Sequence, residues 1–328
     1  MPQGILAGMK NNRKKRKKSR LLRFVLFMLV FTVVLLGGWY FIAGRLYDKM
    51  NYQAAGEHDA KPWKKDGVVN ILLIGNDSRE NGEDGRSDAM ILLSISDKTR
   101  KIYMTSILRD IYVEIPGHGG SRLNAAYAYG GPELLMETIE QNFGIEVSRY
   151  VQVNFEAFAS LVDAAGGVDL ELSVEEIEYV NGYLVEYNML TQRPEGTDYM
   201  DTSAGGLVHL NGAQALAYSR IRYIGTDFGR TQRQRKVLAA VVKKMPSSLL
   251  SGKGGLFGEL LPNLATNLKK GECFALSLQA GKFLLYDMEQ GSIPLEGTYR
   301  DANIRGMAVL EIDFDKNREY FSANIYGR

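Results

Sequence analysis

The sequence predicts a layered α/β domain, an α-β-α arrangement around a central, mixed and largely buried sheet. Three short apolar runs are bounded by turn-forming residues, as expected for strands buried on both faces of a sheet. They are residues 67–75 (GVVNILLIG), 88–96 (DAMILLSIS) and 101–107 (KIYMTSI). Residues 130–144 change to helical spacing and stop at Gly144, after which YVQVNF returns to a strand pattern. This alternation predicts helices on both faces of the sheet.

The rest of the chain continues the same pattern. Residues 156–172 read as a helix, a Gly-Gly turn and a strand, whereas residues 173–209 form a polar insertion rich in Tyr and Glu that could cover a site. Residues 211–222 and 229–245 have helical spacing, and the tail after Gly271 mixes helix and strand.

One N-terminal transmembrane helix is predicted to precede this domain. Residues 24–43 are twenty uncharged, mostly apolar residues, enough to span about 30 Å as a helix. The preceding 23 residues hold nine basic and no acidic residues, which places the N-terminus in the cytoplasm and the remainder outside. A cleaved signal peptide is the alternative, but its apolar core is usually shorter. The basic run beside the apolar segment favours topology and attraction to anionic membrane lipid over nucleic-acid binding.

These features divide the chain into four predicted parts. They are a cytoplasmic basic tail (1–23), a transmembrane anchor (24–43), a stalk (44–66) and an extracellular domain (67–328) whose motifs lie within 67–245. The net charge of +2 suggests no particular partner. The single cysteine, Cys273, excludes an internal disulfide, and three widely separated histidines give little support to a zinc hydrolase.

The first candidate loop, residues 75–89, lies between two predicted buried strands. It holds Asp77, Arg79 and Asp88 among other charged residues. Carboxylates at the carboxyl end of a strand lie where open α/β folds bind ligands, and hard oxygen ligands without Cys or His suit Mg²⁺. A solvated acidic turn is the alternative.

The second region, residues 106–131, also follows a predicted strand. Arg109 and Asp110 come directly after KIYMTSI, and Arg122 precedes a helix rich in Ala and Tyr. An adjacent Arg-Asp pair is commonly a structural salt bridge, but its position at a strand end keeps a catalytic or binding role open.

The third region, YSRIRYIGTDFGRTQRQR (218–235), holds five arginines and one carboxylate, Asp227. On a helix over 229–245, Arg230 and Gln234 share one face in the first turns, and Arg235 and Lys236 are expected to point to solvent. Guanidinium groups at a helix N-terminus match phosphate oxygens. Carboxylates from elsewhere in the fold could instead neutralise them. Taken together, the three regions predict a pyrophosphate and phosphoryl-transfer site.

Six motifs, in this order, resemble the LytR-CpsA-Psr family of bacterial cell-envelope enzymes. They are NILLIGNDSR, GRSDAMILLSI, SILRDIYVEIPG, RLNAAYAYGG, LVDAAGGVDL and YSRIRYIGTDFGRTQRQR. The resemblance implies a Mg²⁺-dependent phosphotransferase, with Mn²⁺ as an alternative ion, which moves a teichoic acid or capsular glycopolymer from a polyprenyl-pyrophosphate carrier to peptidoglycan. A non-catalytic carrier-binding regulator and a polyprenyl-pyrophosphate hydrolase are the alternatives.

The resemblance also implies roles for individual residues. Asp77 and Asp88 would hold the metal, and the pyrophosphate would be bound by Arg79, Arg109, Arg122, Arg220, Arg222, Arg230 and Gln234. The implied catalytic set is Arg109, Asp110, Arg122, Arg220, Asp227 and Arg230, with Asp110 or Asp227 orienting or deprotonating the acceptor hydroxyl. The family often has Arg-Gln-Gln where this chain has Arg233-Gln234-Arg235, which puts only the third position in doubt. Five apolar residues are candidates to shelter a lipid tail, with a core role as the alternative: Ile145, Val147, Phe155, Phe158 and Leu161.

Overall fold

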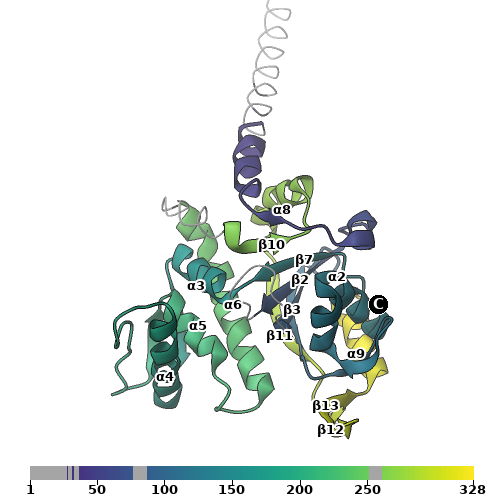
Figure 1. Cartoon of the computed structure of the whole chain (residues 1–328). Helices are drawn as coiled ribbons and strands as arrows, with labels where there is room; N and C mark the ends of the chain where they lie inside the picture. Colours follow the sequence, from purple (N-terminus) through teal and green to yellow (C-terminus); the bar gives the residue numbers. More distant parts are fainter. Residues whose placement is uncertain (1–27, 29–31, 33–36, 77–86, 251–260) are drawn as a thin grey trace, which may run out of the picture. The chain divides into compact units, whose positions relative to one another are not determined.

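The computed structural model describes residues 28, 32, 37–76, 87–250 and 261–328 (Figure 1). The chain separates into two compact units, Met1–Asp48 and Lys49–Arg328. The predicted anchor, residues 24–43, falls mostly outside the described residues, as does the predicted cytoplasmic tail. Within the described residues, no helix is both long enough and apolar enough to cross a membrane. The strands and helices from Asn51 onward belong to the second unit.

A seven-stranded mixed sheet lies at the centre of the second unit, with strand order β1-β10-β7-β2-β3-β4-β11. Its strands are β1 (Asn51–Tyr52), β2 (Val68–Asn76), β3 (Ser87–Ser96), β4 (Lys101–Ile107), β7 (Arg149–Val153), β10 (Leu264–Thr266) and β11 (Asp287–Ile293). β2 is parallel to β7 and antiparallel to β3, which is antiparallel to β4, and β4 is parallel to β11. The carboxyl ends of β2, β4, β7 and β11 therefore meet the amino end of β3 at one edge. This confirms the predicted mixed α/β sheet.

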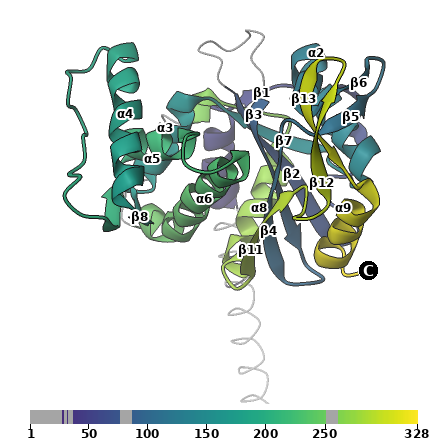
Figure 2. The same cartoon turned by 90° about the horizontal axis from the view of Figure 1, so that it is seen from below.

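Helices lie on both sides of this sheet (Figure 2). α2 (Leu123–Phe143) and α9 (Phe314–Tyr320) pack on one face, and α8 (Lys270–Phe283) packs on the other. α6 (Asp227–Leu250) contacts β4 and β11, and a group of shorter helices packs beside it. That group comprises α3 (Phe155–Ala164), α4 (Val174–Leu190) and α5 (Gly212–Arg220).

Short ribbons and turns complete the second unit. They are β5 (Tyr112–Ile115) with β6 (Gly119–Arg122), β8 (Val168–Leu172) with β9 (Gly206–Leu210), and β12 (Tyr299–Ile304) with β13 (Met307–Ile312), together with η1 (Gly56–Ala60), η3 (Leu261–Asn263) and η4 (Phe321–Ile325).

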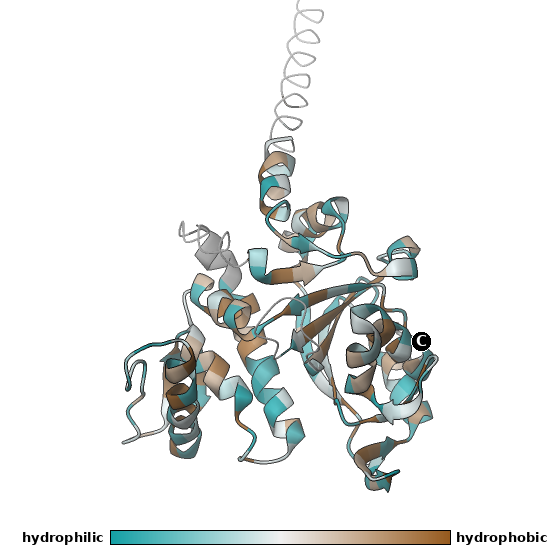
Figure 3. Ribbon diagram, in the orientation of Figure 1, coloured by the Kyte–Doolittle hydropathy of each residue, from teal (hydrophilic) through white to brown (hydrophobic). Residues whose placement is uncertain are grey.

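The apolar runs form strands because their alternate residues enter two different cores. In β2, Leu72 and Ile74 pack in the cluster that contains α2, whereas Val69 and Ile71 pack in the cluster that contains α8. The central strands are correspondingly hydrophobic in Figure 3, while the first turns of α6 are hydrophilic. The polar first turns of α6 are therefore suited to contacts with charged groups.

The region predicted as a polar insertion, 173–209, contains a well-formed helix rather than a loose flap. Ser173 caps α4 and exchanges hydrogen bonds with Glu176, which is a capping box. Ile177, Val180 and Leu184 recur at helical spacing and are buried against α5. The many Tyr and Glu residues hid this apolar stripe in the sequence. The region continues to β9, which pairs antiparallel with β8.

The folded unit begins earlier than the predicted boundary at Gly67. Within the predicted stalk, β1 pairs with β10, and η1 follows. Arg149, on β7, holds this segment: its guanidinium donates to the backbone oxygens of His58 and Lys61. The same group forms a two-pronged ion pair with Glu272 of α8, at 2.7 and 2.6 Å. Because Arg149 is 1% exposed, this pair fixes three segments that are distant in sequence.

We expect Glu272→Gln to destabilise the second unit by about 3–5 kcal/mol, because it leaves the buried Arg149 charge without its counterion. Glu289→Gln is the matched control, since Glu289 forms a half-exposed pair with Lys101 and should cost less than about 1 kcal/mol. Urea unfolding of the two variants measures both values. Equal effects would show that the buried pair is not a special constraint.

Candidate functional site

Asp88 and Arg109 are brought together by the register of two central strands. β3 and β4 are antiparallel, with Ile91 opposite Ser106. Continuing this register by three residues sets Asp88, at the start of β3, opposite Arg109, just beyond the end of β4. Their side chains form an ion pair between Arg109 Nη1 and Asp88 Oδ1. The predicted loop regions therefore meet at the sheet edge.

The loop between α5 and α6 and the first turn of α6 each supply one further arginine to Asp88. Arg222 Nη2 lies 3.0 Å from Asp88 Oδ2, and Arg230 Nη2 donates to the Asp88 backbone oxygen at 3.2 Å. Arg230 also lies 2.9 Å from Asp227 Oδ1, one turn earlier at the start of α6. Three guanidinium groups thus surround one aspartate, with a second carboxylate beside them.

Asp110 links this cluster to Arg122. Its two carboxylate oxygens lie 3.5 Å from Arg109 Nε and 3.7 Å from Arg122 Nε, which are ion-pair distances without close hydrogen bonds. The stronger contact of Arg122 is a 2.9 Å hydrogen bond to the backbone oxygen of Ala308 in β13. Arg122 therefore joins the site through Asp110 rather than through Asp88.

Burial and charge act oppositely on the two arginines nearest the centre. Burial lowers the pKa of Arg109, but the carboxylates of Asp88, Asp110 and Asp227 outweigh it, and the pKa is raised. Burial also lowers the pKa of Arg230, which is 2% exposed, and repulsion from Arg109 works against the attraction of Asp227. Arg230 Nε is buried without a hydrogen-bond partner among the described residues. An anion would relieve this incomplete neutralisation.

Arg220 lies apart from the Asp88 cluster in a setting that sequence reasoning missed. Its guanidinium carbon is 4.8 Å from the ring centre of Phe155 and 5.3 Å from that of Tyr183. Arg220 Nη2 also lies 3.3 Å from Glu186 Oε2. Two sequence features could have indicated this setting: Phe155 follows a strand end, and Tyr183 and Glu186 share one side of a helix. Only the tertiary fold brings these residues to Arg220.

Gln234 faces the interior near α5. Its side-chain nitrogen donates to the Ser219 backbone oxygen at 3.5 Å, and its buried oxygen has no partner among the described residues. Arg233 beside it is structural: it lies 3.0 Å from Glu176 Oε1 and donates to the backbone oxygens of Ile221 and Ile224.

The expectation that Arg235 points to solvent is wrong, whereas Lys236 is exposed as predicted. Arg235 is 6% exposed, and burial lowers its pKa to about 10. Residues two apart lie on roughly opposite sides of a helix, so Arg233 and Arg235 cannot share a face. α6 packs against α5 and also against β4 and β11, so it is covered on two sides. The apolar spacing in the sequence indicated only one of these two buried sides of α6.

Asp77 and Arg79, the other predicted metal and pyrophosphate ligands of the first loop, lie outside the described residues. Within the part of the chain that the structure describes, no three His, Cys, Asp or Glu side chains gather as a metal site. Asp88 offers carboxylate oxygens of the type that Mg²⁺ prefers, although arginines contact both of them.

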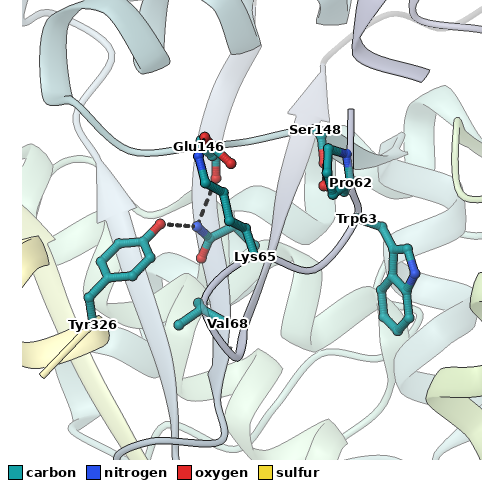
Figure 4. Close-up of a pocket in the computed structure, with 8 residues that line it drawn as sticks. Pro62, Trp63, Lys65, Val68, Glu146, Ser148 and Tyr326 are labelled. Atoms are coloured by element: carbon teal, nitrogen blue, oxygen red, sulfur yellow. Dashed lines mark hydrogen bonds and ion pairs between the residues drawn. The ribbon is translucent and has the colours of Figure 1, made fainter. Parts of the chain in front are cut away.

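Two cavities lie at the other end of β2 and do not match this chemistry. The smaller holds about 10 Å³, and there the Asn70 amide donates to Tyr326 Oη and to the Glu146 backbone oxygen (Figure 4). The larger holds about 270 Å³. The three cations that line it, Lys65, Arg318 and Arg328, are each paired with a carboxylate. Neither cavity offers a charge that an anionic ligand would neutralise.

The geometry defines a polyanion-binding site at the carboxyl edge of an α/β sheet. Guanidinium groups from a β-strand end, a loop and a helix N-terminus converge there, which suits a pyrophosphate better than a single carboxylate.

The chain belongs to the LytR-CpsA-Psr family, because the family model, described as the LytR_cpsA_psr family, matches residues 42–321. It is 36% identical over 255 residues to the polyisoprenyl-teichoic acid–peptidoglycan teichoic acid transferase TagU of Bacillus mycoides (strain KBAB4), covering 76% of each chain. The transferase of the same name from Oceanobacillus iheyensis is 34% identical over 274 residues, or 77% of this chain and 79% of the relative. The chain is accordingly an enzyme of the transferase class.

Solved structures agree with the fold. The crystal structure of B. subtilis TagT has a TM-score of 0.61 and 28% identity, covering 82% of this chain and 95% of that one. A structure described as YwtF (TagT) with bound octaprenyl pyrophosphate lipid also scores 0.61 at 28% identity, covering 84% and 98%.

We expect Arg230→Ala to weaken the binding of inorganic pyrophosphate by about 10- to 100-fold, because it removes a buried charge-assisted donor. Isothermal titration calorimetry of the purified chain measures this change. Lys236→Ala, an exposed change on the same helix, is the control and should leave affinity within about twofold. Similar affinities for both variants would remove Arg230 from the anion site.

Proposed function

We propose that this chain is a Mg²⁺-dependent phosphotransferase that attaches an anionic cell-wall glycopolymer, of teichoic acid or capsular type, to peptidoglycan. The donor would be the glycopolymer linked to a polyprenyl-pyrophosphate carrier. The observation that carries the proposal is the convergence of Arg109, Arg222 and Arg230 on Asp88. The names of the relatives support the same substrates.

The arginines are suited to charge that builds up during phosphoryl transfer. Arg230 is almost fully buried, the Arg109 side chain is about one-fifth exposed and Arg222 is half-exposed, so the cluster has an inner and an outer part. Fixed donors of this kind stabilise the equatorial and leaving oxygens without reorganising during the reaction. Arg122 and Arg220 lie at its margins and would contact the more distant parts of the donor.

The proposed reaction is a displacement at the phosphorus that carries the sugar. A hydroxyl oxygen of peptidoglycan forms a bond to this phosphorus, and the bond to the bridging oxygen breaks, so that polyprenyl phosphate leaves. Asp110 is the better candidate to accept the hydroxyl proton, because its carboxylate makes only long contacts with Arg109 and Arg122. Asp227, in contrast, is engaged by Arg230 at 2.9 Å.

Asp88 is the described residue that would hold Mg²⁺, with Asp77 as the second ligand expected from the sequence. When bound, the ion would neutralise charge on the pyrophosphate oxygens. Asp88 itself restrains Arg109 and Arg222, so its carboxylate would have two roles, one toward the metal and one toward the arginines.

The predicted anchor sets the proposed location. We propose a single-pass membrane protein with a cytoplasmic N-terminus and an extracellular catalytic domain, in contact with membrane lipid. This location would give the site access to the lipid-linked donor and to peptidoglycan. Of the residues considered as lipid shelter, Ile145 and Val147 are core residues packed with α2, while Phe158 and Leu161 pack beside the α4–α5–α6 core.

The full chain, incubated with synthetic lipid-linked glycan, peptidoglycan and Mg²⁺, should form ligated product. Arg230→Ala should lower kcat/KM by about 10²–10³-fold, because the lost donor acts on developing charge. Lys236→Ala should retain the wild-type rate. Free glycan phosphate without acceptor would instead identify a hydrolase, and binding of the carrier without any product would identify a regulator.

Removing Mg²⁺ with EDTA should lower wild-type transfer by at least about tenfold, since charge neutralisation at the pyrophosphate would be lost. Asp88→Asn should abolish most of this difference by removing a metal ligand. Calorimetric titration of Mg²⁺ into each protein with inorganic pyrophosphate gives a second readout. Full Mg²⁺ stimulation in Asp88→Asn would contradict a metal role for this carboxylate.

A further inference from the structure

Tyr223, the residue that follows Arg222 in the chain, presents an aromatic ring to solvent. It is 76% exposed, although it follows Arg222, whose guanidinium contacts Asp88. Its ring stacks on that of Tyr179 from α4, with centroids 5.8 Å apart and an interplanar angle of 17°. One face of the Tyr223 ring is therefore covered by Tyr179, and the pair presents an exposed aromatic surface.

The stacked pair belongs to a larger aromatic group. Tyr183 lies one turn after Tyr179 on α4, and it flanks the Arg220 guanidinium together with Phe155. Single exposed aromatic residues are common on protein surfaces, whereas here two rings flank Arg220 and two further rings stack where α4 meets the loop that carries Arg222. This group, Phe155, Tyr179, Tyr183 and Tyr223, is here called the aromatic rim.

A buried arginine holds both halves of the stacked pair in place. Arg233 lies 3.0 Å from Glu176 Oε1, in the first turn of α4, and Glu176 in turn caps that helix with Ser173. The same guanidinium donates to the backbone oxygens of Ile221 and Ile224, on either side of Arg222 and Tyr223. The loop and α4 are thus tied together, so the stacked pair is ordered before any ligand binds.

We propose that Tyr223, backed by Tyr179, is a stacking subsite for the sugar ring attached to the pyrophosphate of the donor. A pyranose ring has a face of C–H bonds that packs on the electron-rich face of an aromatic ring. The proposal rests on the proposed function and adds a part of the donor that the arginines do not recognise. Tyr223 would thereby contribute to selecting a glycan-bearing carrier over the bare carrier.

The donor sugar fits this position better than an acceptor sugar. Adjacent Cα atoms are about 3.8 Å apart, so Tyr223 lies within one residue of a side chain that reaches the site centre. In the donor the first sugar is bonded directly to the pyrophosphate, so one ligand can contact Arg222 and Tyr223 together. The acceptor approaches the opposite side of the reacting phosphorus from the leaving group and has no such fixed distance to Arg222.

The test compares two ligands for the full chain in detergent: octaprenyl pyrophosphate, and the same lipid carrying a disaccharide on its terminal phosphate. Calorimetry should show that the sugars increase wild-type affinity by about tenfold. Tyr223→Ala should lose most of this increase and bind the bare lipid within about twofold of wild type. Tyr223→Phe keeps the ring and should retain the increase.

Tyr129→Ala is the matched control, because Tyr129 is also an exposed tyrosine stacked on a ring, that of His118, at 4.7 Å. It should leave both affinities unchanged. The subsite is wrong if Tyr223→Ala weakens both ligands equally, if it weakens neither, or if the sugars add nothing to wild-type affinity. If the wild-type chain binds neither ligand, the proposed function is wrong as well. If it binds the bare lipid but the sugars add nothing, only the subsite is wrong.

Discussion

The repulsion among three arginines is the constraint on which the site depends. Arg109, Arg222 and Arg230 all contact Asp88, and one carboxylate cannot neutralise three guanidinium charges. Asp227 and Asp110 reduce the imbalance from two sides. With Arg122, which also contacts Asp110, four guanidinium groups face three carboxylates, and the one remaining positive charge suits an anion with several oxygens. Arg230 is almost fully buried, and its Nε has no partner among the described residues, so an anion there would satisfy a buried donor.

The fold offsets the repulsion among the three arginines by holding each of them on a different element. Arg109 follows a central strand, Arg222 lies in a loop, and Arg230 lies in the first turn of α6. The loop and helix are fixed in turn by Arg233, which contacts α4 and two backbone oxygens. Arg149 performs a similar task at the other end of the domain, where it joins η1, β7 and α8. Buried arginines therefore serve two purposes in this chain, and their partners distinguish them.

Much of the architecture could be predicted from local patterns. The runs 67–75, 88–96 and 101–107 correspond closely to β2, β3 and β4, because continuous apolar stretches between turns are typical of strands covered on both faces. α4 was missed because its three buried apolar residues are separated by Glu, Tyr, Asn and Gly. β1 was missed because it has only two residues, too few for any period to appear.

For the site, the sequence by itself determined which residue types were available and in what order. A strand end followed by Arg109 and Asp110, and a predicted helix that starts with Arg230, were enough to predict an anion site, and six ordered motifs indicated the family. Only the tertiary structure decided the partners. Strand register paired Asp88 with Arg109, and packing of α6 on two sides buried Arg235 and gave Arg233 a structural role. Periodicity describes one element at a time, whereas these contacts join residues up to 142 positions apart in the chain, as between Arg230 and Asp88.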